Sequence, residues 1–472
     1  MNTRTDTREP LSLSGLLAKQ RVSFLRDGPP ALAQRRANLK KLKTALLARR
    51  EAFARAVNSD FGYRSAYETA IIDVVPLIHS INYLHRHLRK WLRPRRRHIA
   101  LHFQPGAARV LYQPLGVIGI ISPWNYPVSL ALMPLATAIA AGNRVMLKPS
   151  EFTPATNEML ATMLREMFSE EEVAVVTGDA DIGAAFAALP FDHLIFTGST
   201  KVGRLVMRAA SENLVPVTLE LGGKSPAIVE PGFSLARSAA SIAFGKLANA
   251  GQTCIAPDYV LVQENDIEPF IEAYKAAAQK FYPDGVSDAA YASIINAGHQ
   301  ARLSALIDDA RSKGARIITI GSANADYKRT LPPIVIVDAN PESTVLKEEI
   351  FGPILPVVAY RDIDDAIAYV NARPRPLALY LFGRDRAISR RVLERTTSGN
   401  VTINDTLLHY AVEDLPFGGV GASGIGAYHG EEGFMALSHG KGVFEQSRLN
   451  FAALLRPPFG RVTDLVLRYL LR

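Results

Sequence analysis

Short apolar runs alternate with helix-length segments over most of the chain beyond residue 115. Strands separated by helices pair in parallel, because the return from one strand to the start of the next needs a crossover. Helices then cover both faces of the sheet, which explains runs that are apolar at every position. The alternation therefore predicts an α/β fold. The predicted strands are residues 117–121, 145–147, 173–176, 194–196, 226–229, 259–262, 317–320, 355–358, 379–382 and 401–403.

These runs form two series, the second of which follows Cys254. We therefore expect two α/β units that join near residue 222. A length of 472 residues, at ~150 residues per domain, also leaves room for a third and smaller element. Before the first series, residues 32–57 predict one amphipathic helix. Its apolar positions are Leu39, Leu42, Leu46, Phe53 and Val57.

The cysteine content and the charge exclude several classes of protein. One cysteine allows neither an intrachain disulfide nor a multi-cysteine zinc site, so we expect a cytoplasmic protein without a metal. The net charge is +9, and seven Lys and Arg residues lie in segment 85–98. Such a patch suits nucleic acid or anionic lipid. No nucleic-acid motif accompanies it, so we interpret it as a solvated helix end and a loop broken by Pro94, with no nucleic-acid partner.

Segments that resemble membrane or targeting signals have other interpretations. Residues 110–143 are uncharged, but the turn at 122–127 leaves pieces shorter than the ~20 apolar residues of a spanning helix. Residues 1–15 lack the apolar core of a signal peptide. Residues 461–472 predict an amphipathic helix that packs on its own protein or a partner subunit, with peripheral membrane contact as the alternative. We expect no stable membrane anchor.

Two glycine-rich segments resemble phosphate-binding loops. Gly419, Gly421 and Gly424 match the string G-x-G-x-x-G, but no strand precedes them, so we interpret them as a loop without a dinucleotide. Residues 196–203 follow a predicted strand and open a predicted helix, whose N-terminus suits a pyrophosphate. Arg204 stands where a P-loop has lysine, which disfavours ATP.

Four residues at the ends of predicted strands suit a nucleotide cofactor. Gly198 allows a sharp turn into the helix, and Ser199 can cap it. Glu151 can accept hydrogen bonds from ribose hydroxyls, and Lys148 can bind the same ribose or a phosphate. An ordinary strand–turn–helix junction and a surface ion pair are the alternatives.

Three residues suit nucleophilic chemistry on a carbonyl. Cys254 lies in a loop between Gly251 and Pro257 and can supply a thiolate. Glu220 is flanked by leucines, and a buried carboxyl with a raised pKa can act as a general base. Asn125 lies in a proline-flanked turn, and a fixed donor to an oxyanion is worth ~2.7–4 kcal/mol. An inert cysteine, a strand-end carboxylate and a turn asparagine are the alternatives.

Seven motifs in one order resemble the aldehyde dehydrogenase superfamily from about residue 15 to residue 445. Glu220 and Cys254 lie 34 residues apart, as in that family. The motifs are PWNYP at 123–127, KPSE at 148–151, FTGSTKVG at 196–203, LELGGKS at 219–225, GQTC at 251–254, EEIFGP at 348–353 and LPFGG at 415–419.

Further motifs resemble the class 3 branch and, within it, the bacterial coniferyl aldehyde dehydrogenases. The class 3 motifs are PLALY at 376–380, LH at 408–409 and GIGAYHG at 424–430. The motifs of the bacterial group are FLRDGPP at 24–30 and the basic RPRRR at 93–97. One departure is Phe244, where many animal members of the branch carry tryptophan.

The resemblance implies two Rossmann-like parallel-sheet domains and a small β oligomerisation arm. It places an NAD(P)-binding domain at residues 1–97 and 115–222 and a catalytic domain at 223–434. It assigns residues 98–114 and 435–472 to oligomerisation and implies a homodimer that exchanges these segments.

The resemblance also implies oxidation of an aldehyde to a carboxylic acid through a thiohemiacetal and a thioester on Cys254. Asn125 and the Cys254 backbone N–H would stabilise the oxyanion, and Glu220 would activate water. The cofactor would be NAD, with NADP as the alternative. The cofactor-binding residues would be Lys148, Glu151, Gly198, Ser199, Gly203, Leu221, Glu349 and Phe351.

The substrate remains open between two classes of aldehyde. Tyr126, Phe244 and Leu408 would line an apolar tunnel. That tunnel suits an aryl or cinnamyl aldehyde such as coniferyl aldehyde, and it also suits a medium or long alkyl aldehyde. The alternatives are a membrane-associated fatty aldehyde dehydrogenase, an acyl-CoA-forming dehydrogenase and a catalytically silent NAD-binding structural protein.

Overall fold

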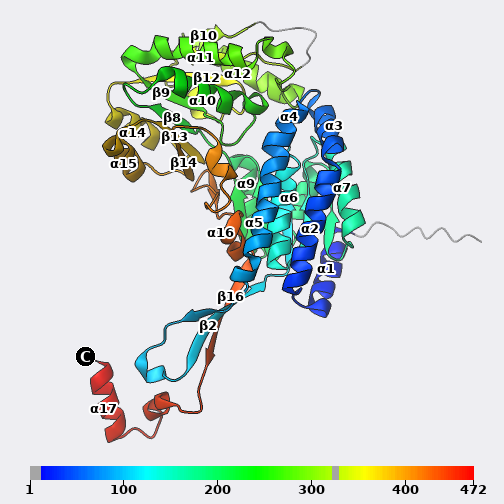
Figure 1. Cartoon of the computed structure of the whole chain (residues 1–472), viewed down its shortest axis with the longest axis vertical. Helices are drawn as coiled ribbons and strands as arrows, with labels where there is room; N and C mark the ends of the chain where they lie inside the picture. Colours follow the sequence, from blue (N-terminus) through cyan, green and yellow to red (C-terminus); the bar gives the residue numbers. More distant parts are fainter. Residues whose placement is uncertain (1–11, 322–328, 472) are drawn as a thin grey trace, which may run out of the picture.

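The computed structural model describes residues 12–321 and 329–471. In this part of the chain the strands form three sheets, two of them covered by helices and the third projecting as an arm (Figure 1). The α/β fold predicted from the alternating pattern is therefore confirmed. The expectation that residues 1–15 form no signal peptide falls mostly on residues outside the described ranges.

The first sheet has six strands within the described residues, in the order β15-β7-β6-β3-β4-β5. All neighbours pair in parallel except β15 and β7, which are antiparallel. The strand order reverses between β3 and β6, and ligands of parallel sheets bind at such a reversal, beyond the carboxyl ends. The strands are β3 (Val117–Ile121), β4 (Arg144–Lys148), β5 (Val173–Val175), β6 (His193–Thr197), β7 (Val217–Glu220) and β15 (Gly424–Ile425).

The second sheet has seven strands among the residues described, in the order β10-β11-β12-β9-β8-β13-β14. Only β10 runs antiparallel to its neighbour. Each predicted apolar run corresponds to a strand, whereas β7, β11 and β15 were not predicted. The division of the runs at Cys254 was wrong, because run 226–229 forms β8, which pairs with β9 and β13 in this second sheet. The strands are β8 (Pro226–Val229), β9 (Tyr259–Gln263), β10 (Arg316–Thr319), β11 (Ile334–Val337), β12 (Ile354–Tyr360), β13 (Ala378–Phe382) and β14 (Asn400–Ile403).

Helices bury both faces of each large sheet. Ile118 and Ile120 point into a core shared with α2, α3, α5, α6 and α7, whereas Val117 packs in a separate core with α1, α8 and α9. These helices are α1 (Leu13–Asp27), α2 (Leu32–Ala48), α3 (Arg50–Phe61), α4 (Ala66–Glu68), the π-helix η1 (Thr69–Val74), α5 (Val75–Trp91), α6 (Ser129–Ala141), α7 (Pro154–Met167), α8 (Ala180–Ala187) and α9 (Thr200–Ser211).

The second sheet packs on α10 and α11 on one face and on α14 and α15 on the other. The helices beyond the first sheet are α10 (Leu235–Leu247), α11 (Ile267–Phe281), α12 (Ala297–Ser312), α13 (Thr344–Lys347), α14 (Ile363–Asn371), α15 (Arg386–Arg395), α16 (Gly430–Ala436) and α17 (Arg461–Leu470). The short 3₁₀-helices are η2 (Leu101–Phe103), η3 (Ala248–Gly251), η4 (Glu264–Asp266), η5 (Gly285–Ser287), η6 (Leu408–Ala411) and η7 (Phe451–Leu455).

The single helix predicted over 32–57 is two helices, so that prediction was wrong in its continuity. Arg49, with φ −110° and ψ 7°, interrupts the helix between α2 and α3. Leu46 and Phe53 are nevertheless both fully buried on either side of the break. The break redirects the chain while keeping both apolar faces on one core.

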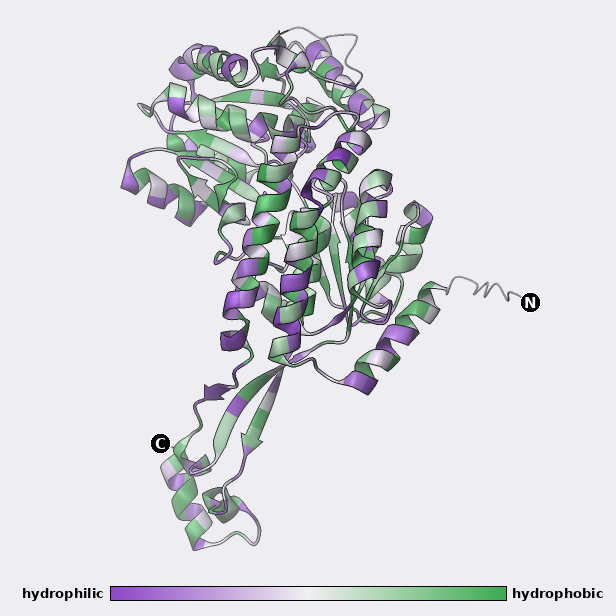
Figure 2. Ribbon diagram, turned by 45° about the vertical axis from the view of Figure 1, so that its right-hand side comes forward, coloured by the Kyte–Doolittle hydropathy of each residue, from purple (hydrophilic) through white to green (hydrophobic). Residues whose placement is uncertain are grey.

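The arm is a three-stranded antiparallel sheet in the described chain, formed by β1 (Arg95–Arg97), β2 (Ala107–Pro114) and β16 (Ser438–Glu445). It projects away from both α/β bodies (Figure 2). The prediction of a loop over the basic residues 95–97 was wrong, because backbone pairing with β2 holds them as an edge strand. Such pairing depends on a distant segment, which local composition does not report.

The predicted C-terminal helix is present as α17 beyond the arm (Figure 1). Val462, Leu465 and Tyr469 on its apolar face are exposed in the protomer. In residues 12–321 and 329–471, no helix has both the length and the apolar character needed to cross a membrane.

The loop that carries the G-x-G-x-x-G string is held against β7. Gly424 pairs with Glu220, and the Leu221 N–H donates to the Ser423 carbonyl over 3.1 Å. Gly424 has φ +155°, and a Cβ there would lie 2.4 Å from the Leu219 carbonyl oxygen.

Gly424→Ala is therefore expected to lower the free energy of unfolding by about 1–3 kcal/mol, the scale of an overpacked core site. The midpoint of urea denaturation measures this change. Gly442→Ala is the matched control, because a Cβ at Gly442 would meet nothing within 4 Å. Equal midpoints for the two variants would contradict a close approach at Gly424.

Candidate active site

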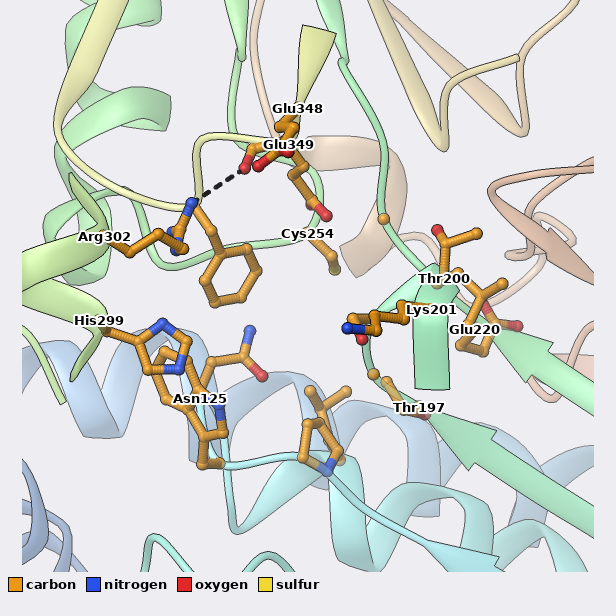
Figure 3. Close-up of a pocket in the computed structure, with 18 residues that line it drawn as sticks. Asn125, Thr197, Thr200, Lys201, Glu220, Cys254, His299, Arg302, Glu348 and Glu349 are labelled. Atoms are coloured by element: carbon orange, nitrogen blue, oxygen red, sulfur yellow. Dashed lines mark hydrogen bonds between the residues drawn. The ribbon is translucent and has the colours of Figure 1, made fainter. Parts of the chain in front are cut away.

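A cavity of about 680 Å³ opens between the two α/β bodies at the carboxyl ends of β3 and β6. It lies where the strand order of the first sheet reverses. Figure 3 shows side chains from both bodies turned into it. Its lining includes Asn125, Gly198, Ser199, Glu220, Leu221, Cys254, Glu349 and Phe351. The folding of the chain thus brings together eight of the residues singled out in the sequence.

Cys254 follows η3 in a tightly turned loop. Asn249, Ala250 and Gly251 all have positive φ, which directs the chain sharply toward the cavity. A Cβ at Gly251 would lie 2.3 Å from the Gly352 carbonyl oxygen, so the loop packs directly against backbone next to Phe351. The Cys254 side chain is partly exposed, and its thiol forms no disulfide.

The surroundings of Cys254 disfavour its thiolate. Burial raises the pKa of the thiol to about 12, and the carboxylates of Glu349 and Glu220 act in the same direction. An isolated thiol has a pKa of ~8.5. Reaction therefore requires a change of environment or removal of the proton at the moment of attack.

Glu220 ends β7 and is almost fully buried. Neither carboxyl oxygen has a hydrogen-bond partner among the described residues, and burial raises the pKa well above its usual value. In Figure 3 the residue lies on the opposite side of the cavity from His299 and Arg302. A buried carboxyl with unused oxygens can take a proton from a bound water.

Asn125 lies in the turn between β3 and α6 and is buried. Its Nδ2 donates to the Gln252 carbonyl oxygen over 3.1 Å, which orients the amide. The second amide hydrogen can serve a ligand, and Figure 3 shows the amide turned into the cavity that Cys254 also lines. This geometry suits an oxyanion formed at a carbonyl attacked by the thiolate.

Glu349 and Phe351 form another wall of the cavity. Burial raises the pKa of Glu349 to about 8, and the charge of Asp258 adds to this shift. Phe351 has φ +50° and packs edge-on against Trp124, with 5.4 Å between ring centroids.

Sequence reasoning missed His299 and Arg302, which line the cavity from the first turns of α12. Arg302 Nη2 donates to the Ile350 carbonyl oxygen over 2.6 Å. Its Nη1 donates to the Glu349 carbonyl oxygen over 3.3 Å, the bond drawn as a dashed line in Figure 3. The His299 ring lies 5.0 Å from that of Trp124. The sequence offered only their i, i+3 spacing as a signal, which places both side chains on one face if the segment is helical.

A second cavity of about 510 Å³ adjoins the first and shares Trp124, Gly198, Ser199 and His299 with it. Lys148 and Glu151 border it, with 3.0 Å between Nζ and Oε2. This second cavity is a slot between α8 and α9. The residues of these two helices that line it are small or apolar: Ala180, Gly183, Ala184, Ala187, Val202, Leu205, Val206 and Ala209.

These features fit a dinucleotide. The slot suits the flat adenine ring of a dinucleotide. Glu151 and Lys148 border the slot, where they could contact the ribose attached to that ring. Ser199 caps α9 by accepting a hydrogen bond from the Val202 N–H over 3.3 Å, and a helix N-terminus at a strand end suits a pyrophosphate. The first cavity then receives the other end of the ligand beside Glu349 and Cys254.

Four residues singled out in the sequence do not border either cavity. Gly203 is buried in α9 against Leu221. Tyr126 is buried, and its hydroxyl lies 2.6 Å from the Thr253 hydroxyl. Phe244 and Leu408 are 44% and 52% exposed. Over the described ranges, no group of three or more His, Cys, Asp or Glu residues could hold a metal ion.

Comparisons with known proteins agree with this geometry. The sequence profile described as "Aldehyde dehydrogenase family" matches residues 29–443. The probable coniferyl aldehyde dehydrogenase of Pseudomonas aeruginosa is 51% identical over 95% of this chain and 94% of its own length. The coniferyl aldehyde dehydrogenase of Pseudomonas sp. strain HR199 is 46% identical over 97% and 96%.

Solved structures show the same fold. The substrate-bound AldH of Staphylococcus aureus has a TM-score of 0.91 and 35% identity, covering 96% of this chain and 98% of that one. A Mycobacterium tuberculosis aldehyde dehydrogenase complexed with NAD⁺ has a TM-score of 0.83 and 29% identity, covering 91% and 89%. The chain therefore belongs to the aldehyde dehydrogenase family and is an NAD(P)-dependent aldehyde dehydrogenase.

Proposed function

We propose that this aldehyde dehydrogenase oxidises an aryl aldehyde, such as coniferyl aldehyde, to the carboxylic acid through a thioester on Cys254. The observation that carries the proposal is that Cys254, Asn125 and Glu220 line one cavity that adjoins a dinucleotide-sized slot. Relatives of similar length that are named for coniferyl aldehyde support the aryl class of substrate.

In the proposed first step, the Cys254 thiolate adds to the aldehyde carbon, and the carbonyl oxygen becomes an oxyanion. Asn125 Nδ2 and the Cys254 backbone N–H donate to that oxygen. NAD(P)⁺, when bound, supplies the acceptor for the hydride that leaves the carbon. Loss of the hydride from the adduct leaves a thioester on Cys254.

Glu220 acts in the second step. It takes a proton from water, the hydroxide adds to the thioester carbon, and the Cys254 thiolate leaves with formation of the carboxylic acid. Burial without a hydrogen-bond partner makes the ionised Glu220 a stronger base. Water in this step, rather than coenzyme A, is the proposed acyl acceptor because the chain keeps Glu220.

The remaining residues hold the ligands. Glu349 and Phe351 hold the nicotinamide end, and Gly198, Ser199, Gly203 and Leu221 shape the pyrophosphate turn. Lys148 and Glu151 hold the adenosine ribose. Glu151 favours NAD over NADP, because its charge repels a 2′-phosphate. The proposed approach for the aldehyde lies outside both cavities and is formed by Tyr126, Phe244 and Leu408, of which Tyr126 is buried and the other two are exposed.

We also propose the larger organisation that the sequence indicated. The NAD(P)-binding domain comprises residues 1–97 and 115–222, except that β1 pairs in the arm, and the catalytic domain comprises 223–434, except that β15 pairs in the first sheet. The segments 98–114 and 435–472 mediate a homodimer. A free cysteine that must stay reduced favours the cytoplasm.

The raised pKa of Cys254 predicts slow alkylation of the cofactor-free enzyme near neutral pH. With a thiol pKa of about 12, the thiolate fraction rises with every pH unit up to that value. The iodoacetamide rate is expected to rise about tenfold per pH unit from pH 7 to 10. Mass spectrometry at Cys254 measures the rate. A plateau near the ~8.5 of an isolated thiol would contradict the buried environment.

Glu220→Gln is expected to allow one hydride transfer and then to stall at the thioester. The amide cannot take the proton from water, so steady-state kcat should fall by about 10²–10⁴-fold. Stopped-flow absorbance of NADH should show a burst of one equivalent per active site.

Cys254→Ala is the matched control for that burst. It should bind NAD⁺ normally but give no burst, with turnover lower by at least about 10⁴-fold. Turnover by Cys254→Ala would refute the assignment of Cys254 as the nucleophile. Wild-type turnover by Glu220→Gln would refute the assignment of Glu220 as the general base. A Cys254→Ala protein with full activity would also favour a site elsewhere in the chain.

The aryl preference predicts that kcat/KM for coniferyl aldehyde exceeds that for hexanal by about 10–200-fold, the range that apolar pocket contacts supply. Phe244→Ala should reduce this ratio because an exposed aromatic face is lost. Phe281→Ala, on the exposed side of α11, is the control and should leave the ratio unchanged. An equal or reversed ratio in the wild-type enzyme would favour an alkyl aldehyde dehydrogenase.

A further inference from the structure

Arg64 is a buried cation directly behind the Asn125 turn. Its side chain is fully shielded from solvent. Its Nη1 donates to the Asn125 carbonyl oxygen over 2.8 Å. Its own backbone N–H donates to Asn58 Oδ1 over 2.9 Å, which fixes the start of the side chain beyond α3. The charge therefore contacts the backbone of the residue whose amide lines the cavity, while Arg64 itself does not line that cavity.

Aromatic rings hold the Arg64 guanidinium. Its Cζ lies 4.7 Å from the centroid of the Tyr126 ring and 5.2 Å from that of Phe61. Tyr126 in turn contacts the Thr253 hydroxyl beside Cys254. The planar guanidinium thus packs on Tyr126, which follows the oxyanion donor in the chain, and on Phe61 of α3, contacts that an ammonium would not reproduce.

The polar surroundings of Arg64 are incomplete. Its Nε lies 3.8 Å from Glu68 Oε2, an ion-pair distance without a hydrogen bond. Its Nε and Nη2 have no acceptor in the part of the chain that the structure describes. Burial raises the pKa of Glu68, and the charge of Arg64 opposes that shift. Arg64 is thus held by its bond to the Asn125 carbonyl, two aromatic rings and the charges of Glu68 and Asp73, while two of its nitrogens lack an acceptor.

The same network of hydrogen bonds reaches the loop that carries Cys254 (residues 249–254). Glu68 Oε1 accepts from the Asn249 backbone N–H, and Asn249 Nδ2 donates to the Asn125 carbonyl oxygen over 3.1 Å. The Asn125 carbonyl therefore accepts from two donors, while the Asn125 amide donates to the carbonyl of Gln252 within that loop. Arg64 and Glu68 together brace the turn against the loop.

We propose that Arg64 is a positioning residue that holds the Asn125 amide in the orientation needed to stabilise the oxyanion. The inference rests on the proposed role of Asn125 and goes beyond it, because Arg64 touches neither cavity. Without the Nη1 donor, the Asn125 turn loses one of two bonds to its carbonyl, and the amide shifts relative to Cys254.

Arg35 is a matched control of the same chemistry. It is also buried, and its Nη1 donates to the carbonyl oxygens of Ala140 and Ala141 over 3.0 and 2.6 Å. These carbonyls lie at the C-terminal end of α6, away from the turn that begins it. Arg35→Met should lower stability while leaving kcat/KM of the folded enzyme within about twofold, as expected away from the reacting groups.

The first experiment compares Arg64→Met, Arg64→Lys and Arg35→Met as full-length enzymes. Arg64→Met should lower kcat/KM for the aldehyde by about 10–100-fold, the scale of a small misplacement of a catalytic group. The Kd of NAD⁺ should not change. Arg64→Lys, which keeps the charge and can still donate to the Asn125 carbonyl, should recover part of the loss. Cys254 alkylation forms no oxyanion, so its rate in Arg64→Met should equal that of the wild type.

The second experiment is a double-mutant cycle with Asn125→Ala. If Arg64 acts through Asn125, the double variant is as slow as Asn125→Ala alone. Losses that multiply, or an Arg64→Met enzyme with wild-type kcat/KM, would overturn the inference. Slowed alkylation in Arg64→Met would also overturn it, since that result means a general collapse of the site. Full activity in Asn125→Ala would instead refute the proposed role of Asn125 itself.

Discussion

The hydrogen bond from the Asn125 amide to the Gln252 carbonyl is the contact on which the site depends. It joins the turn after β3 to the loop that carries Cys254, and these segments belong to different α/β bodies. Gln252 is itself tied to Ser293 and Ile295, so the loop is fixed from a third direction. A donor and a nucleophile from separate sheets can act on one carbonyl only if such bonds fix their separation.

Removal from water governs the chemistry of the groups held in this way. Burial raises the pKa of Cys254, Glu220 and Glu349, so all three favour their neutral forms in the ligand-free protein. Three neutral groups can share a small cavity without mutual repulsion. The arrangement keeps the thiol unreactive by default, and the aldehyde and cofactor meet a site whose bases become strong once ionised.

Much of the fold could be predicted because the strands have a local signature. Ile118 and Val260 sit in runs that are apolar at every position, which only a strand buried on both faces requires. The break at Arg49 and the pairing of Arg95–Arg97 escaped prediction, since both depend on where other segments pack. The site residues within motifs were recognised, but His299 and Arg302 lie outside any quoted motif and were found only in the cavity.

The sequence by itself determined the alternation of strands and helices, the single thiol, and the order of the motifs that identify the family. These properties are local, because each depends on residue types within a short stretch of chain. Only the tertiary structure decided that Glu220, Asn125 and Cys254 share a cavity and that Arg64 stands behind Asn125. The physical reason is that a buried hydrogen bond between residues 61 positions apart leaves no local pattern and forms only when the packed core brings both segments together.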